Sequence, residues 1–504
     1  MAVDGQGLTV TGPADGVAAY DRAIAYLIRF RPEVVDAAAA AAGAGTVMGS
    51  VLGAYLGLMS TEEGAVAAAG RALGRYVSPG SDESALTARE RAHLAAARRW
   101  IGGDMAGAGY LLSAISIEAP RDLLSLFTGH QIDFFRGDAA NLRDRVGRAL
   151  GGWRGDEPEA GFLYGMYAFG LEECNQYGQA ADAGGRAVDG NADDVWGIHA
   201  VVHTYEMQGQ VPDGVRFMRA RRRDWAEGNF LNVHNAWHYA LYLLQAGDIA
   251  GALDVYDTFL HHATSDDIAL ELLDATALLW RLHLEGTPVG GRWRPLAQAW
   301  TRVLTPGFYP FNDMHAIMAY VGAGDLDQAR TVVAALDRVV REDGTHTTGG
   351  QMTSSVGLPV CRSLISFGTG RYEQVLDDLM PIRTRVHEFG GSHAQRDAVE
   401  RTLLESAIRA GRHEVAAALV SERLANRESS TYAWHKRALL LSRLGDAPGA
   451  AAATAREGEL TSEIRAAVAA VLSEGSGDCS PRVCRQRAWH QTANGTIRAW
   501  YGSN

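Results

Sequence analysis

A glycine that recurs at the spacing of a helix pair constrains the fold of this 504-residue chain more than any other feature. It lies in a repeated phrase of helical run, glycine, polar residue and second helical run, clearest at 243–253, 320–330 and 367–376. Glycine suits the left-handed residue that closes a helix, so each copy predicts a helix end, a turn and a helix start. The glycines are spaced by 31 to 46 residues and are Gly103, Gly137, Gly178, Gly209, Gly247, Gly286, Gly324, Gly370, Gly411 and Gly445.

Apolar residues flank these turns at helical spacing, and alternating strand patterns are scarce. The mean interval of 38 residues is close to the roughly 34 of a tetratricopeptide unit. We therefore expect an all-α fold, an α-solenoid of tetratricopeptide-like helix hairpins that form a right-handed superhelix. Residues 1–474 would be one domain of about ten hairpins, and 475–504, which lacks the turn phrase, would be an irregular and disordered tail.

Composition excludes several classes of function. A net charge of -12 and a pI near 5.7 disfavour nucleic-acid binding, which needs a basic face. Residues 37–60 are uncharged and long enough to cross a bilayer, but they are rich in Ala and Gly, and helical repeats bury such stretches. The four cysteines form no disulfide framework, and the N-terminus lacks a signal core. We expect a soluble, cytoplasmic protein that binds neither nucleic acid nor a membrane.

Polar residues fall in register when the repeats are aligned on their glycines. Asn235, Asp274 and Asn312 stand twelve residues before the glycine, and His238 and His315 stand nine before it. Residues three apart share a helix face, so two equivalent Asn-x-x-His pairs are predicted on first helices. Because first helices line the concave surface of such solenoids, these side chains should point inward.

Two further histidine pairs have i, i+4 spacing, His199 with His203 and His234 with His238. This spacing lets two imidazoles of one helix reach one ion, so a divalent metal is the cofactor that the pattern allows. Glu206, one turn after His203, would add a carboxylate or act as a general base. The open alternative is that each histidine is a hydrogen-bonded core residue.

A later first helix begins near Ser392, a suitable N-cap. His393, Arg396 and Asp397 follow in its first turns and could face the same pocket. Arg396 would clamp a carboxylate or phosphate, or simply pair with a neighbouring acid.

Cys361 stands in the same column as His238 and His315. A thiol nucleophile with a histidine partner and a small core cysteine are both open at this stage. Neither a Gly-x-Ser-x-Gly elbow nor a phosphate-binding Gly-Lys-Ser/Thr occurs, and Lys436 is the one lysine of the chain.

Six segments together resemble the tetratricopeptide repeat protein 38 family: HAVVH (199–203), EMQG (206–209), HNAWH (234–238), DATALLWR (274–281), FNDMH (311–315) and GSHAQRD (391–397). The resemblance covers roughly residues 20–460 and implies a helical-repeat fold. The family has no generally assigned reaction, so the resemblance implies no catalytic roles.

Two functions follow from these patterns. The first is an inner pocket for a small molecule or metal, with proton transfer or metal-assisted hydrolysis as its chemistry and the question of catalysis left open. The catalytic residues of this pocket would be His203, His238 and Glu206. The metal ligands would be His199, His203, His234 and His238. The ligand-binding residues would be His199, His234, Asn235, Asp274, Asn312, Asp313, His315, His393, Arg396 and Asp397. The second is a scaffold that holds a protein partner, as a peptide or helix, in its concave groove.

Overall fold

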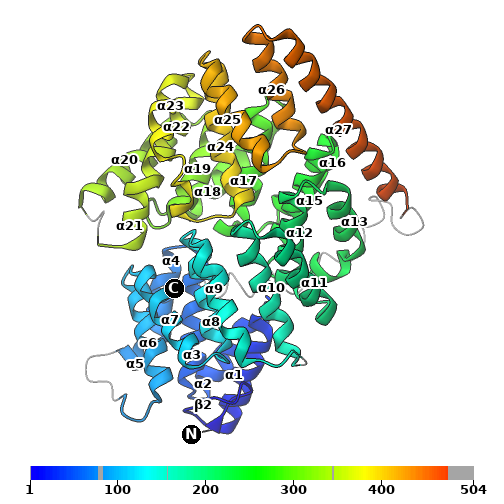
Figure 1. Cartoon of the computed structure of the whole chain (residues 1–504). Helices are drawn as coiled ribbons and strands as arrows, with labels where there is room; N and C mark the ends of the chain where they lie inside the picture. The colour runs from blue at the N-terminus through cyan, green and yellow to red at the C-terminus, as the bar shows by residue number, and fades with distance from the viewer. Residues whose placement is uncertain (1, 78–82, 156, 343–345, 475–504) are drawn as a thin grey trace.

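The computed structural model describes residues 2–77, 83–155, 157–342 and 346–474, and the regular structure there is almost entirely helical (Figure 1). The strands are β1 (Ala2–Val3) and β2 (Thr9–Val10), a short antiparallel pair. The N-terminal helices are α1 (Ala14–Leu27), α2 (Val34–Gly43), α3 (Val47–Met59), α4 (Gly64–Ala72), α5 (Gly74–Val77), α6 (Ala88–Ile101), α7 (Met105–Glu118), α8 (Leu123–Phe135), α9 (Ala139–Ala149) and η1 (Leu150–Gly152).

Helix pairs continue through the rest of the described chain. The middle part holds α10 (Pro158–Glu173), α11 (Tyr177–Gly190), α12 (Val195–Met207), α13 (Val211–Ala220), α14 (Arg222–Trp225), α15 (Asn232–Gln245), α16 (Ile249–Val255), η2 (Tyr256–Leu260), α17 (Ala269–Leu284), η3 (Gly290–Arg292) and α18 (Trp293–Val303). The last part holds α19 (Pro310–Ala323), α20 (Leu326–Glu342), α21 (Thr348–Met352), η4 (Thr353–Gly357), α22 (Leu358–Gly368), α23 (Tyr372–Leu379), η5 (Met380–Ile382), η6 (Val386–Phe389), α24 (His393–Arg409), α25 (His413–Asn426), α26 (Thr431–Arg443) and α27 (Ala447–Ser473). The predicted all-α solenoid is confirmed.

Nine of the ten predicted turn glycines have a positive φ, between 62° and 85°, as a helix-closing residue requires. Gly178 is the exception, because it lies inside α11. Asn175, with φ 60°, closes α10 in its place. Asparagine tolerates this conformation because its short polar side chain can hydrogen-bond locally.

The two helices of a hairpin differ sharply in burial. In α12, 12 of 13 residues are buried, and in α19, 12 of 14. In α20, the partner of α19, only 3 of 17 are buried. First helices therefore form the inner layer of the solenoid and second helices the outer layer, which is why polar groups on α12 and α19 are shielded from water.

Residues far apart in sequence meet where the N-terminal helices contact those after α18 (Figure 1). The Asn312 amide donates to the carbonyl and hydroxyl oxygens of Thr61, both at 3.0 Å. The Tyr309 hydroxyl donates to the Phe135 carbonyl at 3.1 Å. These bonds join residues 251 and 174 positions apart, so the superhelix folds back on itself and its N-terminal helices pack against the start of α19.

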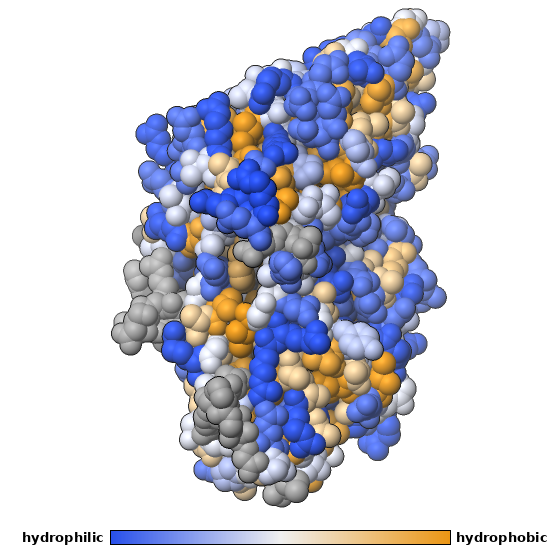
Figure 2. Space-filling model, turned by 90° about the vertical axis from the view of Figure 1, so that its left-hand side faces the viewer, coloured by the Kyte–Doolittle hydropathy of each residue, from blue (hydrophilic) through white to orange (hydrophobic). Residues whose placement is uncertain are grey.

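The uncharged stretch 37–60 is divided between α2 and α3, which are separated by Gly45 at φ 93°. No helix in the described ranges is long and apolar enough to cross a membrane. The face shown in Figure 2 is mixed, with apolar side chains in separate patches among hydrophilic ones. The predicted tail, 475–504, lies outside the described residues.

Candidate functional site

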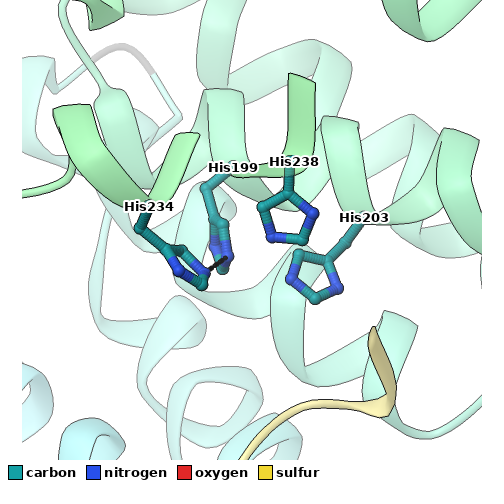
Figure 3. A group of neighbouring side chains, drawn as sticks. All are labelled: His199, His203, His234 and His238. Carbon is teal, nitrogen blue, oxygen red and sulfur yellow. Dashed lines mark hydrogen bonds between the residues drawn. The ribbon is translucent and has the colours of Figure 1, made fainter. Parts of the chain in front are cut away.

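Four imidazole rings meet between two inner helices (Figure 3). They come from the two i, i+4 pairs predicted from the sequence, one pair on α12 and the other on α15. Ring centroids of neighbouring members are 4.3 to 4.9 Å apart. One nitrogen from each ring lies within 4.8 Å of the others. We refer to these residues as the histidine cluster: His199, His203, His234 and His238.

Carboxylates face the outer side of three of these rings. The Nδ1 atom of His234 is 2.8 Å from Asp274 Oδ2, on α17. The Nδ1 atom of His238 is 2.9 Å from Glu206 Oε2, on α12. The Nδ1 atom of His203 is 3.5 Å from Glu172 Oε2, on α10. When a carboxylate accepts the Nδ1 proton of a histidine, the Nε2 atom of that ring keeps its lone pair. This lone pair is directed at the other rings of the cluster.

A chain of hydrogen bonds runs from Asp274 through His234 to His199. The Nε2 atoms of His234 and His199 are 3.0 Å apart, so one must donate and the other accept. With the His234 Nδ1 proton held by Asp274, His199 is the donor and keeps a lone pair on its own Nδ1. That Nδ1 atom is buried and has no hydrogen-bond partner among the residues that the structure describes. The chain therefore ends on a nitrogen with a free lone pair.

Burial controls the charge of the cluster. Desolvation lowers the pKa of His203 to about 4 and holds the pKa values of His199 and His238 well below the ordinary value. Burial also raises the pKa of the Glu206 carboxyl, and it raises that of Glu172 more strongly with the help of the neighbouring Glu173. At neutral pH these three histidines are uncharged and can accept a proton or a metal ion.

An apolar cavity of about 210 Å³ lies against His199 and His234. It occupies the interior of the superhelix, with walls from α3, α8, α12, α15 and α17. Its lining contains no lysine or arginine. Its aromatic residues are Phe30, Phe127, Phe134, Phe135, Trp196, Phe230, Tyr309 and Phe311.

Two carboxyls open onto this cavity. Glu62 accepts a hydrogen bond from the backbone nitrogen of Ala269 at 2.9 Å and so satisfies the start of α17. Burial raises its pKa. Burial and the charges of Asp266, Asp274 and Asp267 raise the pKa of Glu271 to about 8. Glu271 is therefore mainly protonated at neutral pH.

The polar residues of α19 are buried, but their hydrogen bonds lead away from the cluster. Asn312 binds Thr61, and Asp313 accepts from the backbone nitrogen of Gly307 at 3.1 Å. The Nδ1–H of His315 donates to the Phe311 carbonyl at 2.8 Å. The metal-ligand groupings among the described residues do not include these three. Cys361 is fully buried, and burial raises the pKa of its thiol, which favours the core-cysteine interpretation.

The residues at the start of α24 lie in two ion-pair networks. Arg396 donates to Glu173 at 3.0 Å, and the backbone nitrogen of His393 donates to the other oxygen of that carboxylate at 2.8 Å. Burial alone would raise the pKa of Glu173, but the charges of His393 and Arg396 lower it. Asp397 pairs instead with Arg401, at 2.7 Å, and with the Arg423 and Arg281 guanidinium groups. The guanidinium of Arg396 is thus held by a carboxylate of the protein itself.

Sequence reasoning missed Glu172 and Glu173, which end α10 beside His203. The repeat alignment used Gly178 as the turn residue, which placed Glu172 out of register with Glu206. Alignment on Asn175, the residue that has positive φ, places Glu172 three residues before the turn. Glu206 stands three before Gly209, so the two carboxylates occupy one column. Treating Asn175 as a helix-closing residue would have revealed the shared column of Glu172 and Glu206.

Comparisons with known proteins leave the site unassigned. No protein-family model matches the chain. Similar solved structures include a monomeric mutant of IFIT1 with Gppp-AAAA, at 12% identity over 89% of this chain and 96% of that one, with a TM-score of 0.39. The TPR domain of P58(IPK) has 11% identity, coverage of 78% and 100%, and a TM-score of 0.20. Naa15/Naa10 bound to HypK-THB has 12% identity, coverage of 74% and 64%, and a TM-score of 0.20. Likenesses this low say nothing about the chemistry of the site.

Proposed function

We propose that the protein binds a small, mainly apolar molecule in the inner cavity and that the histidine cluster acts on the polar end of that molecule. The cavity of about 210 Å³ beside His199 and His234 is the observation that carries this proposal. An apolar protein cavity of about 150 Å³ is large enough to bind benzene. A molecule with one substituted aromatic ring, or an aliphatic one of similar size, fits this volume.

The contacts that close the superhelix favour a pocket over an open groove. Asn312 and Tyr309 bridge to the N-terminal helices, so the inner layer faces other parts of the same chain. A peptide scaffold needs a long accessible groove with dispersed anchors. The scaffold is therefore our second candidate, supported by the solenoid architecture alone.

Proton transfer is the chemistry that the cluster supports. The chain from Asp274 through His234 orients His199, a residue that lines the cavity, and a small shift of its ring would present the buried Nδ1 lone pair to a hydroxyl group or a water molecule there. Asp274 stabilises the positive charge that develops on the imidazoles, because it is buried and accepts from His234. His203 and the hydrogen-bonded pair of His238 and Glu206 lie beside this chain.

Membership of the tetratricopeptide repeat protein 38 family is part of the proposal. Two of its resembling segments, 199–203 and 234–238, supply the histidine cluster, and 274–281 supplies Asp274. The cytoplasmic location stays a prediction from the sequence.

Titration with toluene and indole, followed by calorimetry and thermal melting, tests the pocket. Val233, only 8% exposed, lines the cavity, so Val233→Phe should fill part of it and weaken binding at least tenfold. Val3→Phe is the matched control, because Val3 is 64% exposed on β1. Absence of binding to the wild type, or equal binding to both variants, would refute the pocket.

Hydrolysis of 4-nitrophenyl acetate tests the proton transfer. Asp274→Asn should reduce the rate at least tenfold while toluene binding stays unchanged, because Asp274 acts through His234 and does not line the cavity. A wild-type rate equal to that of free imidazole at the same concentration would exclude catalysis by the cluster.

A further inference from the structure

We propose that the histidine cluster binds one divalent transition-metal ion through the Nε2 atoms of its four imidazoles, with Asp274, Glu206 and Glu172 holding the opposite nitrogens. This inference goes beyond the proposed function and does not depend on it, because an ion can bind whether or not the cavity takes a ligand. Metal binding would move the His199 proton from Nε2 to Nδ1, so it would replace the hydrogen bond between His199 and His234. The ion would lie between α12 and α15, next to the wall of the cavity.

The carboxylates are placed as they are around metal-bound histidines. A histidine that binds a metal usually donates its other ring N–H to a carboxylate or carbonyl, which fixes the ring and its tautomer. Asp274 and Glu206 lie at 2.8 and 2.9 Å from Nδ1 of His234 and His238. Glu172 lies 3.5 Å from Nδ1 of His203. A hydrophobic core gives no reason for two such hydrogen bonds and a third neighbouring carboxylate to occur in one cluster.

Unsatisfied polar atoms accumulate at the same place. Among the described residues, Nε2 of His238 and both ring nitrogens of His203 are buried without a hydrogen-bond partner. Buried polar groups cost about 1–3 kcal/mol each when they are left unpaired, so native proteins keep few of them. A metal ion satisfies several imidazole nitrogens at once. The further unpartnered atoms nearby are Nδ1 of His199, both carboxylate oxygens of Glu172, Oδ1 of Asp274 and both side-chain polar atoms of Asn235.

The spacing of the nitrogens is close to that of a tetrahedral site. With metal–nitrogen bonds of about 2.0–2.1 Å, the nitrogens of such a site are roughly 3.4 Å apart. The Nε2 atoms of His199 and His234 are already 3.0 Å apart, and one ring nitrogen from each of the four histidines lies within 4.8 Å of the others. Small rotations of these buried rings would bring the remaining nitrogen–nitrogen distances to those of a tetrahedral site.

The donor set and the charge select the kind of ion. Neutral imidazoles suit zinc, copper, nickel, cobalt and iron, whereas calcium and magnesium prefer oxygen ligands. Four uncharged ligands leave the charge of a dication uncompensated. The carboxyl groups of Asp274, Glu206 and Glu172 lie one ring away, and a bound dication favours their negatively charged forms. The site therefore fits a divalent transition metal.

Metal analysis of untagged full-length protein tests this site. The metal content is measured by mass spectrometry, and the protein is then stripped with dipicolinate and titrated with Co²⁺, which reports tetrahedral coordination by visible d–d absorption. The test variant combines His203→Gln and His238→Gln. His315→Gln is the matched control, because His315 is also buried with an unpartnered Nε2 but lies outside the cluster.

We expect about one equivalent of metal, and saturation at one Co²⁺, in the wild type and the control, with less than a tenth of this in the double variant. Glu206→Gln keeps all four ligands and should weaken Co²⁺ affinity about 10- to 100-fold, which decides the question if the double variant does not fold. Failure of the stripped wild type to bind Co²⁺, or full binding by the double variant, would overturn the site. Toluene binding by the stripped protein shows separately whether the pocket holds.

Discussion

Replacing Asp313 with asparagine should stabilise the protein more at pH 8 than at pH 5. Asp313 is fully buried on α19, and in the described part of the chain its carboxyl oxygens accept only from the backbone nitrogen of Gly307, at 3.1 and 3.3 Å. Burial raises its pKa from 3.8 to about 8, and the hydrogen bond from Gly307 offsets only part of this rise. The folded state therefore keeps a proton that the unfolded state releases.

The sign of the pH dependence follows from the bound protons. Between pH 4 and pH 8 the folded state binds more protons at Asp313 than the unfolded state does, so raising the pH lowers the free energy of unfolding. Each unit of pKa difference corresponds to about 1.36 kcal/mol, which gives a loss of up to about 5 kcal/mol at pH 8. Asparagine has no such titration, so its advantage over aspartate should grow by about 3–4 kcal/mol between pH 5 and pH 8.

Urea unfolding of the wild type and Asp313→Asn at several pH values from 5 to 8 measures this difference. Other titrating groups affect both proteins equally and cancel in the comparison. Asp327→Asn is the matched control, because that side chain is 95% exposed and should give a difference that hardly changes with pH. A difference between wild type and Asp313→Asn that is the same at pH 5 and pH 8 would show that Asp313 is ionised in the folded protein, contrary to our reasoning.

Three further substitutions probe the packing by urea or thermal unfolding. Asn312→Ala should cost about 1–3 kcal/mol by leaving the buried oxygens of Thr61 without donors, and an unchanged midpoint would mean that water replaces the amide. Asp133→Ala should cost about 3–5 kcal/mol, since it leaves the buried guanidinium of Arg145 without its carboxylate; a loss below 1 kcal/mol would contradict this. Gly137→Ala should cost more than about 1 kcal/mol, because φ is 62° and the added Cβ would lie 1.8 Å from a backbone oxygen of η6; a neutral result would show that this contact is relaxed in solution.

Local chemistry in the sequence was enough to predict the helices and most of the turns. Glycine is favoured where a helix must close with positive φ, and nine of the ten glycines have this conformation. The exception, at Gly178, arose because Asn175 can adopt the same conformation. The i, i+4 spacing also placed the members of each histidine pair on one helix face, because that relation depends only on helical geometry.

Which of the inward-facing residues meet was decided by the tertiary structure. His238 and His315 occupy equivalent positions in their repeats, yet His238 faces Glu206 whereas His315 binds the Phe311 carbonyl. A repeat alignment treats these positions as the same. The turn of the superhelix, and its closure by contacts such as that of Asn312 with Thr61, give each position different neighbours. The sequence by itself therefore determined the helices, their inner faces and the candidate side chains, because these depend on contacts between near neighbours. The cavity, the convergence of the four imidazoles and their pairing with Glu172, Glu206 and Asp274 depend on how successive hairpins pack, and only the tertiary structure decided them.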